Sequence, residues 1–138
     1  MIDFFTDNHY DAHPGRMIFE HLPERLRRRI RFDEDDWRRL ETGGWIDDCD
    51  LVVLHLIGGS CGVAHPGPGA ERAMRAWCEK GGDLLLLHGA SAAFWQWPWW
   101  RTIVGRRAGN AAPCRWKKRS VPPTWSATIC RTATTTKR

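Results

Sequence analysis

Apolar residues along this chain form short runs separated by polar or glycine-rich turns, a pattern typical of alternating strands and helices. Three runs predict strands, at Ile2–Phe5, Leu51–Ile57 and Asp83–His88, and a fourth strand is predicted at Arg29–Phe32. The runs at Leu51–Ile57 and Asp83–His88 are apolar at nearly every position, as parallel strands buried on both faces are. The chain therefore predicts a mostly parallel sheet.

Helices are predicted between these strands. Apolar residues recur at every fourth position between residues 14 and 28, and Pro23 is expected to interrupt that helix. A short helix with an acidic start is predicted over Asp33–Leu40. A longer helix is predicted from Pro68, an ordinary first helical position, to the glycine pair at Gly81.

The stretch from residue 51 to residue 88 thus predicts a strand, a helix and a second strand. Such a unit forms a parallel pair of strands with the helix packed across one face. The predicted fold class is an α/β fold with an open, mostly parallel, doubly wound sheet. A length of 138 residues favours a single domain.

The net charge of +5 is unevenly distributed and marks a change at about residue 105. Residues 1–104 contain 12 Lys or Arg and 16 Asp or Glu, whereas residues 105–138 contain nine basic residues and no acidic one. The second segment also lacks an apolar period. We expect a partial α/β domain over residues 1–105 and a basic tail over residues 106–138 that is disordered or non-native. Because the basic charge belongs to this tail alone, nucleic-acid binding is disfavoured.

The chain carries no pattern that predicts export or membrane insertion. Its longest apolar runs are far shorter than the roughly 18 residues of a membrane span, and the N-terminus opens with an acidic residue at Asp3. The five cysteines are odd in number and include no C-x-x-C pair. These features predict a cytoplasmic protein without a disulfide framework or a membrane partner.

Several histidines follow the predicted strands. His9 and His13 come after the first strand, His65 follows the third together with Cys61, and His88 closes the fourth. Ligands bind outside the carboxyl ends of parallel strands, so these loops predict a common site. We expect His88, His9 and His13 to be catalytic, as acid–base groups or metal ligands; a polar turn that caps the next helix is the alternative for the latter two. Cys61 and His65 could form a nucleophilic pair, although a small loop cysteine is the simpler interpretation.

Four tryptophans lie within Ala93–Trp100, where they either pack in the core or stack on a sugar ring. Trp95 and Trp97 are predicted to face a ligand, together with His65, Cys61 and the backbone at Gly59. His55 lies inside a buried strand and is predicted to be a satisfied core histidine. No recognised ligand spacing is present, so a divalent metal is an open alternative and no cofactor is assigned.

Several segments, in this order, resemble the ThuA-like family of trehalose-utilisation proteins: His9–Gly15, Leu51–Ile57 with the following Gly-Gly turn, His65–Ala70, Gly81–Gly89 and Ala92–Trp97. The resemblance implies a flavodoxin-like fold of the class I glutamine-amidotransferase type and a bacterial cytosolic protein that handles trehalose or a similar sugar. It maps the histidine-bearing loops of the family onto His9, His13 and His88. The sequence after His88 is Gly-Ala-Ser and has no elbow cysteine, so glutamine amidotransfer is not supported.

The resemblance ends at about residue 105, whereas such domains continue with further strands. We therefore expect a truncated member whose last residues are read out of frame; the alternative is a genuine basic extension that folds on a partner. An incomplete sheet is also compatible with a homo-oligomer. The favoured function is a sugar-modifying enzyme that uses histidine acid–base or metal-assisted chemistry. The alternatives are a non-catalytic sugar-binding or regulatory module and an inactive fragment.

Overall fold

The computed structural model describes residues 1–57, 65–104 and 127–130. Its centre is an open sheet of four parallel strands in the order β2-β1-β3-β4, with β5 added antiparallel beside β4. The strands are β1 (Ile2–Thr6), β2 (Ile30–Glu34), β3 (Leu51–His55), β4 (Asp83–Leu87) and β5 (Ala127–Cys130). The open, mostly parallel sheet is confirmed. The strand β5 lies in the segment where the sequence predicted no regular element.

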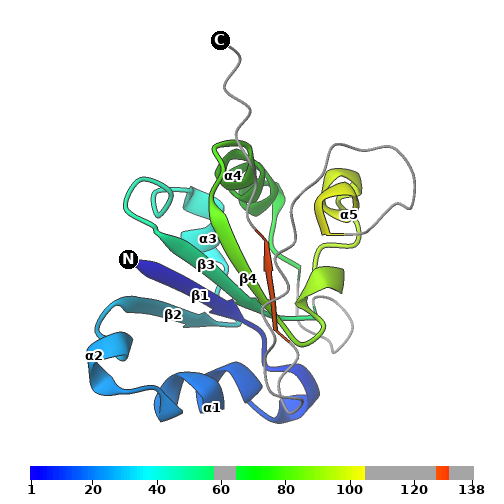
Figure 1. Cartoon of the computed structure of the whole chain (residues 1–138). Coiled ribbons are helices and arrows are strands. Elements are labelled where there is room, and N and C mark those ends of the chain that lie inside the picture. The colour runs from blue at the N-terminus through cyan, green and yellow to red at the C-terminus, as the bar shows by residue number, and fades with distance from the viewer. Residues whose placement is uncertain (58–64, 105–126, 131–138) are drawn as a thin grey trace.

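Helices cover both faces of this sheet, as a doubly wound fold requires (Figure 1). They are η1 (His9–Asp11), α1 (Pro14–His21), α2 (Glu24–Arg27), α3 (Arg38–Thr42), α4 (Pro68–Glu79), η2 (Ala90–Ala92) and α5 (Pro98–Val104). Helices α1 and α2 lie on one side, and α3, α4 and α5 lie on the other (Figure 1). Among the helices of the described ranges, none combines the length and the apolar character that crossing a membrane requires.

The helix boundaries confirm one prediction and correct another. Pro23 separates α1 from α2, as its missing N–H and fixed φ led us to expect. The helix predicted over Asp33–Leu40 is wrong in its first half, because α3 begins only at Arg38. Asp33 and Glu34 instead extend β2 and pair with the end of β1. Strand pairing with a distant segment overrode the local acidic signal for a helix start.

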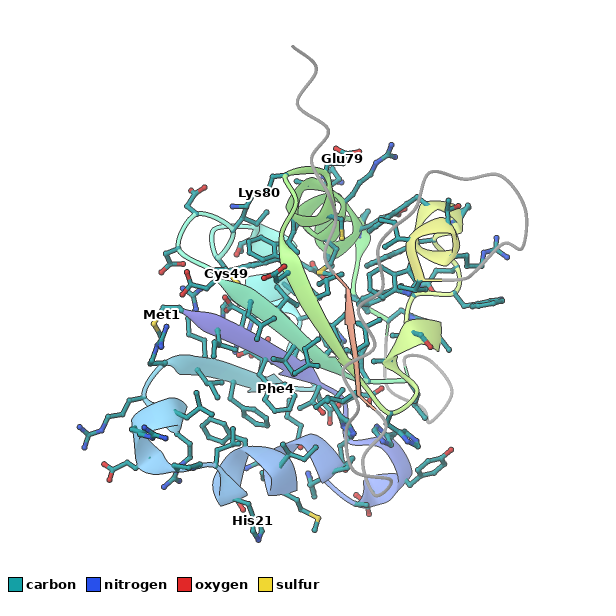
Figure 2. All side chains as sticks on the ribbon, in the orientation of Figure 1. Met1, Phe4, His21, Cys49, Glu79 and Lys80 are labelled. Carbon is teal, nitrogen blue, oxygen red and sulfur yellow. The ribbon has the colours of Figure 1, made fainter. Side chains whose placement is uncertain are left out.

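Alternating residues of β1 supply the two layers of the core. Phe5 faces the larger cluster, where its ring meets Trp45, which in turn contacts Trp77 of α4. Phe4 faces the opposite layer, between the sheet and α1 in Figure 2, and its ring packs edge-on against Phe32 of β2 at 5.4 Å. Because β1 lies between β2 and β3, its carboxyl end lies within the sheet edge, between the ends of these two strands.

Candidate functional site

The carboxyl ends of the four parallel strands bring polar residues to one edge of the sheet. Glu34 is the last residue of β2, Asp7 follows β1, His55 ends β3, and His88 follows β4. In the register of the sheet, Thr6 of β1 lies opposite both Glu34 and His55. This edge is where the sequence analysis expected the site.

Three histidines gather at this edge and form what we call the histidine cluster: His9, His55 and His88. The ring centroid of His9 lies 5.1 Å from that of His55 and 5.9 Å from that of His88, on which it stacks with an interplanar angle of 10°. His55 and His88 are 6.1 Å apart. His9 and His55 are buried, whereas His88 is exposed. The cluster therefore has two inner imidazoles and one that meets solvent.

The buried carboxylate of Asp7 orients His9. Its Oδ1 lies 2.6 Å from Nδ1 of His9, and its Oδ2 accepts a hydrogen bond from the backbone N–H of Ile57 at 3.0 Å. A carboxylate at this distance takes a proton donor, so Nδ1 of His9 carries the hydrogen and Nε2 is left as the acceptor. An aspartate that fixes the tautomer of a histidine is the arrangement used in acid–base catalysis.

The environment of His55 keeps its imidazole neutral. Burial, followed by the neighbouring rings of His9 and His88, lowers the pKa of His55 from 6.5 to about 4. Within the described part of the chain, its Nδ1 has no hydrogen-bond partner. A buried polar atom without a partner is costly, which makes this position a candidate for a functional role.

His88 leaves β4 in the left-handed region, with φ at 51°. Residues other than glycine adopt this conformation at a cost, and such strain concentrates at functional sites. The strained turn holds His88 beside the ring of His9. The sequence-predicted partners His9 and His88 are therefore brought together.

His13 lies in a neighbouring polar group rather than in the histidine cluster. Its Nδ1 is 2.9 Å from Oε2 of Glu34, and the same oxygen accepts hydrogen bonds from Nε and Nη2 of Arg16 at 2.9 and 2.8 Å. The Glu34 side chain is 4% exposed. The carboxylate of Glu34 therefore orients the ring of His13, and the catalytic role expected for His13 stays a prediction.

The predicted substrate-binding residues differ in their exposure to solvent. His65 is exposed and its Nδ1 lies 3.1 Å from Nε2 of Gln96. Trp95 is 59% exposed, with the guanidinium of Arg101 5.4 Å from its ring centroid. Trp97 is buried and stacks on a core phenylalanine, so the expectation that it faces a ligand is corrected to a packing role. Cys61 and Gly59 lie outside the described residues.

His55 is a member of this group of side chains that the sequence did not predict. The run around it is apolar, which is typical of a satisfied core histidine. The sequence predicted that this strand runs to Ile57, whereas in the structure β3 ends at His55, which brings its side chain to the carboxyl edge.

A metal site is not preformed in the described residues, where no group of three or more His, Cys, Asp or Glu side chains is placed to hold an ion. Comparisons with family models, with curated proteins and with solved structures find no match for this chain.

Proposed function

We propose that this chain is a ThuA-like protein of carbohydrate utilisation that transfers protons to and from a sugar at the histidine cluster. The observation that carries the proposal is the pair of Asp7 and His9, joined over 2.6 Å, with the exposed His88 stacked on His9. The sugar is proposed from the resemblance of the chain to trehalose-utilisation proteins.

The proposed mechanism assigns a different task to each histidine. Nε2 of His9 accepts a proton from a sugar hydroxyl or from water, and the carboxylate of Asp7 stabilises the imidazolium that forms. The oxygen that has lost its proton to His9 forms a new bond to a sugar carbon. His88 is exposed and supplies a proton to the oxygen whose bond to the same carbon breaks. The lowered pKa of His55 keeps its imidazole neutral well below pH 7, so it adds no positive charge that would oppose protonation of His9.

A divalent metal held by the same cluster is the second candidate. The ring centroids of the three imidazoles lie within 6.1 Å of one another. Nδ1 of His9 donates its N–H to the carboxylate of Asp7, which leaves Nε2 for a metal, as is common in metal-binding histidines. The donor chemistry fits zinc or a similar ion, but the rings would have to turn to share one. Mass spectrometry under native conditions, with and without a chelator, tests for a bound metal. A metal lost from His9→Ala and retained in His21→Ala would favour this candidate.

The proposed role of His88 is tested by replacing it with alanine. His88→Ala is expected to lose at least about 100-fold in turnover of a responsive sugar, the usual contribution of one acid–base group, while sugar binding persists. His21→Ala is the control, since His21 lies on α1 and projects away from the sheet in Figure 2. Turnover is followed by NMR with trehalose, maltose and glucose, and binding by calorimetry.

Each outcome of this experiment discriminates between the functions. Lost turnover with retained binding supports the acid–base proposal. Binding without turnover in the unsubstituted chain favours the non-catalytic sugar-binding module. Turnover that is equal in His88→Ala and in the unsubstituted chain would contradict the assigned role of His88.

A further inference from the structure

We propose that Tyr10 is the residue on which the sugar ring stacks, beside the ring of His9. This inference rests on the proposed function, because it names the substrate contact of the same site. Tyr10 belongs to the loop between β1 and α1, within the short helix η1.

The loop that carries Tyr10 is anchored on both sides. The ring of His9 is held by Asp7 at 2.6 Å, and the ring of His13 is held by Glu34 at 2.9 Å. The loop is also closed on itself, because the backbone N–H of His13 donates to Oδ1 of Asn8 at 2.8 Å. Tyr10 therefore sits in a segment whose two ends are fixed to the sheet edge.

The backbone of this loop is strained in a way that directs Tyr10 to solvent. Tyr10, Asp11 and His13 adopt positive φ angles of 60°, 51° and 44°. Bulky residues rarely take this conformation, which persists only where surrounding contacts enforce it. The anchors at His9 and His13 supply those contacts.

The ring of Tyr10 is 75% exposed and yet contacts the site. Its centroid lies 5.6 Å from the centroid of the His9 ring, in an edge-on arrangement with an interplanar angle of 85°. A large aromatic ring held in solvent by a strained backbone is preorganised for a ligand, which lowers the entropic cost of binding. A sugar ring stacked on the side chain of Tyr10 would therefore lie next to the imidazole of His9.

The chemistry of tyrosine fits a sugar. A pyranose has an apolar face of C–H groups, which packs on an aromatic ring, and a rim of hydroxyls, which a phenol and imidazoles can bind. Among the described residues, Trp95 is the other exposed large aromatic residue, but the guanidinium of Arg101 lies over its ring at 5.4 Å. Tyr10 is therefore the better platform among the two.

The sequence contains one tyrosine, which makes a direct test available. The full chain labelled with 3-fluorotyrosine gives one ¹⁹F resonance, from Tyr10. Titration with glucose, maltose and trehalose is expected to give a saturable shift of this resonance with at least one of the sugars. Tetramethylammonium, a cation that also binds aromatic rings, is expected to give no shift. A shift with tetramethylammonium alone would overturn the sugar assignment, and no shift with any probe would overturn a binding role for Tyr10.

Substitutions separate stacking from hydrogen bonding. Tyr10→Phe is expected to retain the affinity for that sugar within a few-fold, and Tyr10→Ala to lose about tenfold, the size of one aromatic contact. Met17→Ala, at an exposed apolar residue of α1, is the matched control and is expected to bind normally. Equal affinities of Tyr10→Ala and Met17→Ala, with equal thermal unfolding, would overturn the proposal.

The labelled His88→Ala variant distinguishes this inference from the proposed function. A retained ¹⁹F shift with lost turnover supports both. A retained shift with undiminished turnover supports Tyr10 and contradicts the role of His88. Turnover in the unsubstituted chain without any ¹⁹F shift contradicts Tyr10 and leaves the acid–base proposal standing.

Discussion

At the scale of single residues, the three members of the histidine cluster have three different environments. His9 is buried against a carboxylate, His55 is buried with an unpartnered Nδ1 among the described residues, and His88 is exposed. Burial penalises the charged imidazolium, and a nearby carboxylate favours it. The surroundings therefore give each ring its own chemistry.

The lowered pKa of His55 predicts a loss of stability in acid. Above pH 6.5 the imidazole is neutral in the folded and the unfolded chain, so it has no effect. Between pH 6.5 and its folded pKa of about 4, the unfolded chain binds a proton that the folded chain does not. Stability therefore falls as the pH falls through this range. His55→Gln is expected to reduce that fall by about 3 kcal/mol at pH 4.

Urea unfolding at several pH values from 7.5 to 4 measures this effect. His21→Gln is the control, because His21 is exposed on α1. Parallel curves of stability against pH for the unsubstituted chain and His55→Gln would show that His55 is not held neutral.

At the scale of elements, the docking of α1 on the sheet depends on a residue without a side chain. A Cβ on Gly15 would lie 2.1 Å from Oγ1 of Thr6, whose hydroxyl donates to the backbone carbonyl of His55 at 2.8 Å. Because Gly15 has no side chain, the first turn of α1 packs directly against Thr6, the last residue of β1. This contact between α1 and β1 sets the position of the loop between them, which carries His9 and His13.

Gly15→Ala is expected to destabilise the fold by about 2 kcal/mol, because the buried Thr6 side chain would have to move. The gain in helix propensity from alanine, about 1 kcal/mol, opposes this loss and is smaller than the clash. Gly44→Ala is the control, since nothing lies within 4 Å of its added Cβ. Chemical denaturation followed by circular dichroism measures both variants. Greater stability of Gly15→Ala than of Gly44→Ala would contradict the close packing of α1.

At the scale of the whole molecule, buried polar groups lie at both edges of the sheet. Opposite the histidine cluster, the fully buried Asp3 accepts a hydrogen bond from Nε of Arg31 at 2.9 Å and pairs with Arg39 at 3.4 Å. Arg31 and Arg39 come from β2 and α3, so the network joins three elements at the amino edge. Burial and then Asp3 raise the pKa of the nearby Cys49 thiol to about 12. Figure 2 shows Cys49 at this edge, near Met1.

Asp3→Asn is expected to destabilise the chain by about 3 kcal/mol, because two guanidiniums lose a buried partner. Asp48→Asn is the matched control. Asp48 also pairs with Arg31, at 2.8 Å, but its side chain is 60% exposed, so a small effect is expected. Thermal unfolding at pH 7 compares the two variants, and equal melting temperatures would show that the buried network contributes little.

The candidate site was predictable only in part. His9 and His88 follow strands whose apolar runs are long enough to recognise, so their meeting at the carboxyl edge could be expected. The pairing of His13 with Glu34 could not, because it depends on β2 reaching Glu34 beside β1. His55 could not be separated from a core residue, since its burial and its unpartnered Nδ1 depend on neighbours from other strands.

The sequence by itself determined the alternation of strands and helices, the break at Pro23 and the parallel character of the sheet. These features follow from local apolar periods and from backbone chemistry. The tertiary structure decided the strand order β2-β1-β3-β4, the register that sets Thr6 beside His55, and the core position of Trp97. Strand pairing and burial depend on contacts between segments far apart in the chain, and only those contacts give each polar side chain its partner and its charge.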